Sequence, residues 1–388
     1  MSWASVTLGE VSTNIQTGPF GSQLHQSDYS DGGVPVVMPK DLVDGHISED
    51  SIARVSMSHV DRLSRHKIEV GDILYSRRGD VGRCAFATEV EQGWLCGTGC
   101  LRVTIDQSKA IPKFIFYQLQ KAETIGWVEK HAVGSTMLNL NTSIFGSVPI
   151  ELPSMAEQQM IVHVLSAYDD LIENNQKQIK LLEEAAQRLY KEWFVDLRFP
   201  GHETTPIVDG IPEGWSKEEL GNIAVLRAGG DRPKVFSKVK TVECSVPVFS
   251  NGTEDEGLYG FTNLAEIYDP CVTISARGSV GYTCLKKVAF VPIVRLISVI
   301  PKQIEVEYLF YFLKNMVFES NGAAQQQITV PMIKSKQVVL PAKTVINLFV
   351  STIRPMMDLR EKLKNKISAL NEARNRLLPK LMSGEIEV

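Results

Sequence analysis

The sequence lacks the features that would place the chain in a membrane or on a secretory route. It has no run of 18 or more apolar residues, and its first ten residues, MSWASVTLGE, do not place an apolar stretch after a basic start. Its six cysteines form no CxxC pair and have no adjoining histidines that would complete a zinc site. We therefore expect a cytoplasmic protein without membrane contact, with no metal site and with reduced, mostly buried thiols.

Signatures of catalysis are also missing. There is no Gly-x-x-x-x-Gly-Lys-Ser/Thr loop for nucleotide phosphates, and the nearest approach to the Asn/Asp-Pro-Pro-aromatic signature of amino-methyltransferases is Asp-Pro-Cys at 269–271. Gly-Thr-Gly at 97–99 is typical of a tight turn, because no helix start with a following acidic partner supports a cofactor loop. We predict no catalytic residue and no cofactor. Because triads are assembled in space, an enzyme with a cleft between two domains stays as an alternative.

The sequence has no large excess of charge of either sign. The net charge is −4, and 44% hydrophobic with 22% charged residues is the composition of an ordinary globular protein. Such a balance neither demands nor excludes nucleic acid as a partner. At 388 residues the chain has material for two or three domains.

The main feature that is present is an internal repeat. Its matches run in collinear order while the offset shrinks in steps from 212 through 199 and 194 to 188, so the two copies differ by loop deletions. The matched positions are Trp3, Leu8, Gly9 and Gly18 with Trp215, Leu220, Gly221 and Gly230, then 34–36 with 246–248, 76–82 with 275–281, 116–117 with 310–311, 152–153 with 340–341 and 188–189 with 376–377. Two unlike copies suit a target with two unlike halves.

Each copy has the same order of elements. A mixed segment of short apolar runs, broken by Gly, Pro, Asn and Asp, is followed by a Leu-Pro pair and one long helix. β-Branched content and turn boundaries predict strands at 34–38, 72–76, 101–105, 246–250, 272–275 and 296–300, and short helices at 113–120 and 306–314. Each copy is therefore expected to be an α+β domain of about 130 to 150 residues.

The first long helix begins at a predicted capping box, Ser154 with Glu157. Apolar residues then alternate at spacings of four and three for more than four heptads, which favours a coiled coil over a surface helix, whose wider stripe would drift at a period of 3.6. The predicted seam comprises Leu165, Ile172, Asn175, Ile179, Leu182 and Leu189 and, at the offset of 188, Leu363, Ile367, Leu370 and Leu377.

The two helices are expected to pair with each other. Residues 151–196 contain nine acidic and four basic side chains, and residues 342–388 contain nine basic and five acidic ones. These opposite charges favour pairing, although exposed ion pairs contribute little each. Asn175 fits either a register-fixing polar residue or a solvated position.

Breaks and linkers are predicted from proline and glycine. Pro355 predicts a kink or break in the second helix, with a corresponding break in the first recapped by Ser166 or Asp169. Residues 198–214, with three prolines and three glycines, predict an exposed, extended linker.

A series of short motifs follows in order along the first copy: GPFGS at 18–22, MPKD at 38–41, GDIL at 71–74, RGDVG at 78–82, LP at 152–153, EQQ at 157–159, IENN at 172–175 and LYKEWF at 189–194. With these motifs, in this order and on a doubled plan, the chain resembles the specificity subunit of type I restriction-modification systems over essentially its whole length. The second copy departs from the pattern, with AGGDRP at 228–233, FSNG at 249–252 and KTV at 343–345.

The resemblance implies an α+β fold with a pseudo-twofold internal repeat, in which two globular target recognition domains are joined by two long helices that form an antiparallel coiled coil. The implied boundaries are 1–153 for the first recognition domain, 154–197 for the first spacer helix, 198–214 for the linker, 215–341 for the second recognition domain and 342–388 for the second spacer helix and tail.

It also implies a non-catalytic subunit that binds double-stranded DNA. Each recognition domain would read one half of a bipartite asymmetric target, and the coiled coil would set the spacer and dock the partners. Two methyltransferase subunits would bring S-adenosylmethionine and methylate adenine, and two ATP-dependent restriction/translocase subunits would cleave. The alternative is a coiled-coil scaffold, or an adaptor for RNA or protein, without DNA sequence specificity.

Candidate DNA-binding residues come from the polar clusters of each domain, because arginine and lysine pair with guanine and phosphate, and asparagine and glutamine with adenine. The run at 325–327 is either an adenine-reading loop or the cap of a strand, and Arg78 and Arg277 could instead hold their own turns through a carboxylate such as Asp80. The candidates are Lys40, Arg77, Arg78, Arg83, Ser135, Thr136 and Asn139 in the first copy and Arg232, Lys234, Asn251, Arg277, Gln325, Gln326 and Gln327 in the second.

Overall fold

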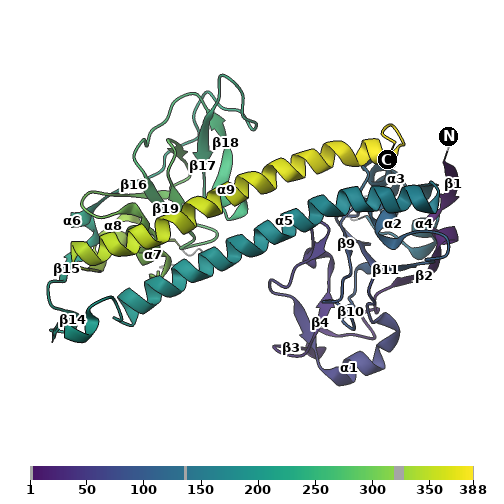
Figure 1. The fold of residues 1–388 in the computed structure, drawn as a ribbon, viewed down its shortest axis with the longest axis horizontal. Coiled ribbons are helices and arrows are strands. Elements are labelled where there is room, and N and C mark those ends of the chain that lie inside the picture. Colours follow the sequence, from purple (N-terminus) through teal and green to yellow (C-terminus); the bar gives the residue numbers. More distant parts are fainter. Residues whose placement is uncertain (1–2, 135–137, 319–326, 388) are drawn as a thin grey trace. The chain divides into compact units, whose positions relative to one another are not determined.

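The computed structural model describes residues 3–134, 138–318 and 327–387. The chain forms two compact units, the first comprising residues 1–175 and 366–388 and the second residues 176–365. Two long helices, α5 (Met155–Tyr190) and α9 (Lys343–Met382), contribute to both (Figure 1). Within the described ranges, none of the helices has the length and apolar content needed to cross a membrane.

The first unit is built on two four-stranded sheets. One is antiparallel in the order β2-β11-β8-β9, the other has the order β10-β4-β7-β3, and two further pairs join β1 to β12 and β5 to β6. The strands are β1 (Ala4–Thr7), β2 (Ser12–Thr17), β3 (Tyr29–Ser30), β4 (Val34–Val37), β5 (Leu42–Val43), β6 (His46–Ile47), β7 (Ala53–Val55), β8 (Ile73–Ser76), β9 (Cys84–Phe86), β10 (Leu95–Cys96), β11 (Cys100–Ile105) and β12 (Pro149–Leu152). The helices are α1 (Met57–Arg62), α2 (Pro112–Leu119), α3 (Ala122–His131) and α4 (Thr142–Gly146).

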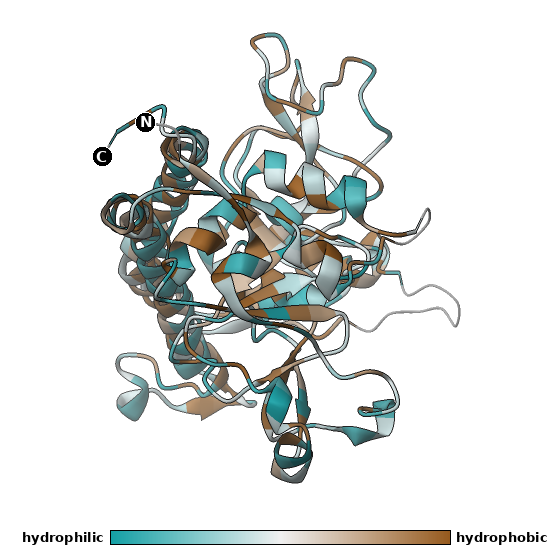
Figure 2. Cartoon of the chain, turned by 90° about the vertical axis from the view of Figure 1, so that its right-hand side faces the viewer, coloured by the Kyte–Doolittle hydropathy of each residue, from teal (hydrophilic) through white to brown (hydrophobic). Residues whose placement is uncertain are grey.

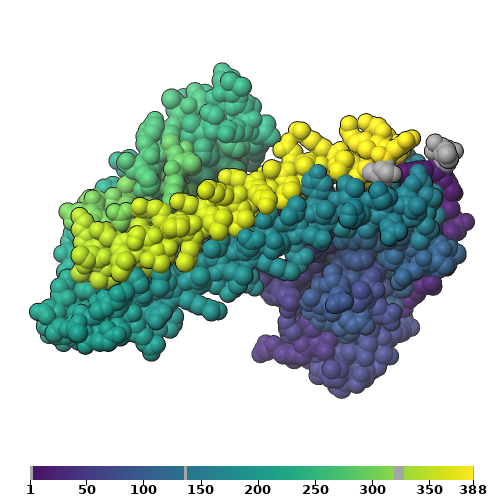
Figure 3. Space-filling model, in the orientation of Figure 1, coloured from purple at the N-terminus to yellow at the C-terminus, as the bar shows by residue number. Residues whose placement is uncertain are grey.

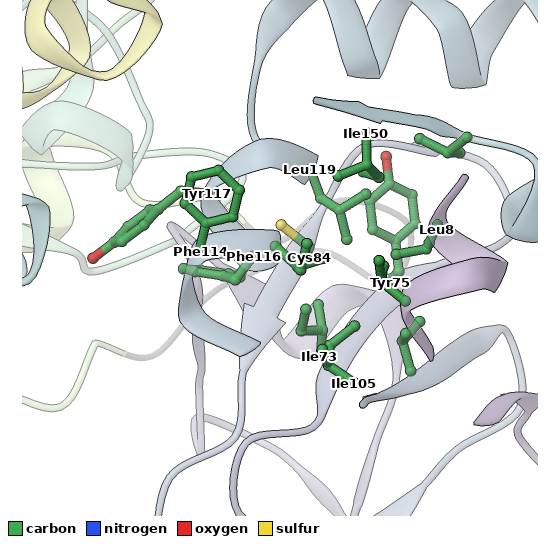
Figure 4. Close-up of a cluster of buried hydrophobic side chains, with 14 of the residues drawn as sticks. Leu8, Ile73, Tyr75, Cys84, Ile105, Phe114, Phe116, Tyr117, Leu119 and Ile150 are labelled. Carbon is green, nitrogen blue, oxygen red and sulfur yellow. The ribbon is translucent and has the colours of Figure 1, made fainter. Parts of the chain in front are cut away.

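A single apolar cluster joins the first sheet to the helices of this unit. Tyr75 on β8 packs on Phe145 with their ring centroids 4.4 Å apart, and Phe114 and Tyr117 on α2 belong to the same cluster (Figure 4). Strand β8 is buried along its whole length, which explains its continuous apolar run. This core also includes Ile161 and Leu165 of α5 and Leu378 and Leu381 of α9, so the sheet and the long helices of the first unit pack together.

The second unit repeats this plan. Its main sheet has the order β16-β22-β19-β20, β17 lies between β18 and β21, and β15 pairs with β23. Its strands are β13 (Ile207–Val208), β14 (Ile211–Pro212), β15 (Ser216–Glu219), β16 (Ala224–Ala228), β17 (Val246–Phe249), β18 (Leu258–Thr262), β19 (Cys271–Ile274), β20 (Thr283–Lys286), β21 (Val291–Pro292), β22 (Ile297–Pro301) and β23 (Gln337–Leu340). Its short helices are α6 (Leu220–Ile223), α7 (Val306–Lys314) and α8 (Val330–Lys334).

The predicted strands and short helices are confirmed. Each of the six predicted strands, and both predicted helices, agrees with an observed element to within one residue at each end. The α+β repeat expected from the sequence is therefore present in the fold.

The long helices run antiparallel in each unit. In the first unit, Ile161 and Leu165 share a core with Leu378 and Leu381, and Figure 3 shows the C-terminal part of α9 (yellow) along the N-terminal part of α5 (teal). In the second unit, the rings of Tyr190 and Trp193 both lie 6.0 Å from that of Phe349. The outward sides of these helices are mainly hydrophilic (Figure 2). Residue numbers thus rise along one helix while they fall along its partner.

All ten predicted seam residues are buried or half-buried. Leu165, Ile172, Asn175 and Leu363 are buried, and the other six are intermediate. Asn175 is 2% exposed, so the solvated alternative for this residue is wrong.

Both predicted helix breaks are wrong. Helix α9 continues through Pro355, and α5 continues through Ser166 and Asp169. Pro355 and Ser351, whose carbonyl loses its helical donor, are both exposed, so solvent can satisfy that carbonyl. Ile353 and Met356 on either side of the proline pack in the aromatic core of the second unit, which holds the helix in place.

The start of α5 follows the predicted capping box. The Glu157 amide donates to Ser154 Oγ at 3.3 Å, and the Ser154 amide donates to Glu157 Oε2 at 3.0 Å. The next residue, Gln158, is buried, accepts from the Ile111 amide at 2.9 Å and donates to the Pro153 carbonyl at 3.0 Å. This glutamine therefore ties the start of α5 to the start of α2.

The segment 198–214 is partly folded, where an extended linker was predicted. It contains a short 3-10 turn at His202–Thr204 and the hairpin of β13 and β14. Phe199 is buried against Trp215, with ring centroids 5.0 Å apart. Most of the other side chains in the segment are exposed, as predicted.

Candidate nucleic-acid interface

In the first unit, an arginine and an amide side chain meet where β8 ends. Arg77 follows the last buried residues of β8, and its side chain is 9% exposed. Its Nη2 donates to Asn139 Oδ1 at 3.3 Å, and its guanidinium lies 6.0 Å from the ring centroid of Phe20. Burial, and then the charge of Arg78, lower the pKa of Arg77. A buried cation is thus held against a half-buried amide.

Hydrogen bonds bring four loops together around this pair. The Arg77 amide donates to the Gly99 carbonyl at 2.8 Å, and the Leu140 amide donates to the Arg77 carbonyl at 2.8 Å. The loop at 18–22 is tied in because Thr98 Oγ1 donates to the Pro19 carbonyl at 2.8 Å. A Cβ on Gly18 would lie 1.9 Å from the Gly97 carbonyl oxygen, which explains the glycine at the start of this motif.

The second unit contains the same pair. Arg277 Nη2 donates to Gln327 Oε1 at 3.2 Å, and the Ile328 amide donates to the Ala276 carbonyl at 3.1 Å. By these backbone bonds Ala276, and not Arg277, corresponds to Arg77. The arginine–amide contact therefore recurs although its arginine has moved by one residue.

The side chains of the other basic candidates in the first unit differ in whether they have partners within the unit. Lys40 Nζ donates to the Ser51 carbonyl at 2.8 Å, and Arg83 pairs with Asp80 at 2.6 Å. Arg78 is exposed, and its side chain makes no hydrogen bond or ion pair with the part of the chain that the structure describes. The expected carboxylate partner, Asp80, thus binds Arg83.

In the second unit, Arg232 and Lys234 are exposed, and the Arg232 guanidinium lies 5.1 Å from the ring centroid of Phe236. Both polar atoms of the Asn251 side chain form hydrogen bonds within the second unit. Oδ1 accepts from the Ala276 amide at 2.7 Å, and Nδ2 donates to the Val294 carbonyl at 2.7 Å. The remaining candidates, Ser135, Thr136, Gln325 and Gln326, lie outside the described residues.

Arg295 is a candidate that sequence reasoning missed. It is exposed, has a left-handed φ of 62°, and its amide donates to the Gly229 carbonyl at 3.0 Å, beside the loop that holds Asn251. Such a φ costs free energy for a non-glycine residue. Arg295 stands in no glycine motif, so only the fold reveals its place.

The described residues contain no group of three or more His, Cys, Asp or Glu side chains placed to hold a metal ion. All six cysteines are free and buried. Burial raises the pKa of the Cys84, Cys96 and Cys271 thiols to about 12. Such thiols stay protonated at neutral pH and are poor nucleophiles.

A cavity of about 510 Å³ lies in the second unit, lined by residues of β20, α7 and the two long helices. Two of its basic lining groups pair with Glu256 or Glu183: Lys286 lies 3.5 Å from Glu256, and Arg360 pairs with both Glu256 and Glu183. Lys287, which also lines the cavity, pairs with Glu307 at 3.3 Å.

The family described as type I restriction modification DNA specificity domain matches residues 1–184 and 212–369. The chain belongs to this family. It carries two specificity domains, one for each copy of the repeat, and the resemblance inferred from the sequence is confirmed.

Relatives of this family cover nearly the whole chain. The type I restriction enzyme MjaIX specificity subunit of Methanocaldococcus jannaschii is 27% identical, over 93% of this chain and 88% of that protein. The HindI specificity subunit of Haemophilus influenzae is 21% identical over 99% of both. The crystal structure of the S subunit from M. genitalium matches with a TM-score of 0.62 at 16% identity, over 98% of this chain and 96% of that one. The predicted fold class, two recognition domains with an antiparallel pair of long helices, is confirmed.

Proposed function

We propose that this chain is the DNA sequence-recognition subunit of a type I restriction-modification complex. Each recognition domain reads one half of a bipartite, asymmetric double-stranded target, and the coiled coil sets the spacer and docks two methyltransferase subunits. Methyl transfer belongs to those subunits, and cleavage belongs to two restriction/translocase subunits. The family match over both copies is the observation that carries the proposal.

The geometry of the loops supports this proposal. In each unit an arginine and an amide meet at the loop that follows the third strand in the order of the main sheet. That strand is β8 in the first unit and β19 in the second. Loops of both units also expose basic side chains, among them Arg78, Arg232 and Lys234. Amide and guanidinium groups are the donors and acceptors that distinguish base pairs in the major groove, while lysine and arginine bind phosphates.

The test is methyl transfer by the assembled complex. The chain would be co-purified with a cognate methyltransferase subunit, and methylated adenines would be mapped on DNA of mixed sequence. We expect methylation at one bipartite motif with the complex, and none with either subunit alone. Methylation by this chain alone would show that it is an enzyme, and sequence-independent methylation by the complex would favour the scaffold or adaptor alternative.

A further inference from the structure

The chemistry of the two arginine–amide contacts fixes the orientation of each amide. A guanidinium can only donate hydrogen bonds, so the amide atom that faces it must be the carbonyl oxygen. Arg77 therefore holds Asn139 by Oδ1, and Arg277 holds Gln327 by Oε1. In each case the amide nitrogen, with its two N–H donors, is left on the other side of the group.

Burial separates the roles of the two partners in the first unit, whereas Arg277 in the second unit is half-buried like Gln327. Arg77 is 9% exposed, and the Nε atoms of Arg77 and Arg277 are buried without an acceptor among the described residues. Asn139 and Gln327 are half-buried, so part of each residue reaches the surface. In both units the arginine binds the amide oxygen and so orients the amide.

The repetition of this contact is informative because the two arginines occupy different positions of the repeat. Arg277 occupies the place of Arg78 in the first unit, and Ala276 occupies the place of Arg77. If the arginines served only to stabilise their own turns, no common acceptor would be needed. Both arginines instead bind the side-chain amide of the residue just before an equivalent backbone donor. That donor is the Leu140 N–H in the first unit and the Ile328 N–H in the second.

We propose that Asn139 and Gln327 are specificity-determining residues, one in each recognition domain, whose amide N–H groups donate to an acceptor on a base edge in the major groove. Arg77 and Arg277 are positioning residues that keep the donor outward. The acceptors of this class are guanine O6 and N7, adenine N7 and thymine O4. This inference rests on the proposed function, and it replaces bidentate adenine reading by Gln327 with a donor-only contact, because the Gln327 oxygen is already engaged by Arg277.

An isosteric substitution tests whether Asn139 reads a base or only pairs with Arg77. Asn139→Asp keeps an oxygen for Arg77 and strengthens that contact with a charge, while the outward donor becomes an acceptor. With the methyltransferase complex, we expect the preferred base pair at one position of one half-site to change, and its original preference to fall roughly tenfold to a hundredfold. The other half-site should be unaffected. Gln327→Glu should change one position of the opposite half-site.

Gln107→Glu is the matched control, because it adds the same charge at an exposed position of the first recognition domain. It should lower affinity for all sequences equally and leave the motif intact. An unchanged motif with Asn139→Asp would overturn the inference and leave the proposed function standing. If the wild-type complex itself shows no motif, the proposed function fails.

A variant that assembles without methylating is compared by binding to duplexes that carry each base pair in turn at every position of the target. A loss of affinity that is equal for all duplexes would overturn the proposal. A loss confined to one position would support it.

Discussion

Buried charges in this chain are stabilised by groups from several elements. Asp169 on α5 accepts a hydrogen bond from the Tyr117 hydroxyl at 2.6 Å and from Arg374 Nη1 at 2.7 Å, with Lys113 Nζ at 3.6 Å. Lys113 also lies over the ring of Phe86, at 4.7 Å. Burial lowers the pKa of Lys113, and Asp169 opposes that change. One carboxylate thus balances two cations between the recognition domain and both helices of the first unit.

Replacement of this carboxylate should destabilise the first unit. Asp169→Asn removes the carboxylate that Lys113 and Arg374 share, and loss of one partner from a buried ion pair costs about 3 kcal/mol or more. Urea unfolding followed by circular dichroism should show this loss. Asp170→Asn, the same change at an exposed neighbouring position, should alter stability by less than about 0.5 kcal/mol. Equal stability of the two variants would mean that the cluster contributes nothing net.

Glu256 plays a similar part in the second unit. It lies in a turn with a left-handed φ of 55°, and its carboxylate receives Lys286, Arg360 and Lys364. Burial alone would raise the pKa of Glu256, but the hydrogen bond and charge of Lys364, with Lys286 and Arg360, hold it at about 2. The three cations also explain how a strained turn is kept against α9.

The depressed pKa predicts acid sensitivity. Because the folded-state pKa of Glu256 lies below its ordinary value of 4.5, its stabilisation is complete above pH 4.5 and declines as the pH falls toward 2. Between pH 6 and pH 3 this one group should cost the wild type about 2 kcal/mol of unfolding free energy. Glu256→Gln should lack that part of the pH dependence, whereas Glu254→Gln, at an exposed site, should keep it. Parallel pH profiles for all three proteins would contradict the ion-pair account.

At the scale of elements, a β-bulge explains one irregularity of the repeat. The β2–β11 ladder shifts register between Thr104 and Ile105, while the equivalent β16–β22 ladder is regular. The first copy therefore has one extra residue in this strand, and Gly18 corresponds in the fold to Gly229. The Gly18–Gly230 match made from the sequence is one residue off, because a bulge leaves no mark in residue identities.

The long helices were predictable because their signals are local and periodic. The capping box fixed the start of α5, and spacings of four and three placed the seam. The break at Pro355 was wrong because packing of Ile353 and Met356 outweighs the local penalty of proline. The π-helical turn at Lys191–Val195 was missed, since it depends on Trp193 and Phe194 packing on Phe349, a contact distant in sequence.

The antiparallel pairing sharpens what a helix insertion should do. A heptad added to α5 alone would shift every later residue against its partner in α9, including Glu183 against Arg360. Heptads added to both helices, between residues 175 and 176 and between 365 and 366, keep the pairing within each unit. Each adds about 10 Å of helix, or about three base pairs of DNA. Mapping of methylated motifs should show a longer spacer between unchanged half-sites, and an unchanged spacer would refute a spacer role for the helices.

At the scale of the whole molecule, the repeat and the order of domains were visible in the sequence, but the compact units were not. Each long helix contributes to both units, so the boundaries at 153/154 and 341/342 separate segments of chain and not separately packed bodies. The arginine–amide contacts could not be predicted from the sequence either, although all four residues were candidates: Arg77, Asn139, Arg277 and Gln327. Each joins residues at least 50 apart in the chain. Such pairs are set by sheet topology, which one sequence does not reveal.

Modular reading of the target is the last prediction. Exchange of residues 1–153 for the first recognition domain of another family member should change one half of the methylated motif and leave the other half intact. The exchange ends just before α5, but the new domain must still meet Gln158 and Asp169, which Ile111 and Tyr117 contact in this chain. The donor domain should therefore be chosen to supply an apolar core for Ile161 and a hydroxyl or cation for Asp169.

Its control is the reciprocal exchange of residues 215–341, which should alter the other half of the motif. Both chimaeras should keep the original spacer, because neither changes α5 or α9. Motif mapping of both complexes checks these outcomes together. If either exchange altered both halves, the two domains would not read DNA independently, and the repeat would have to be a single composite recognition surface.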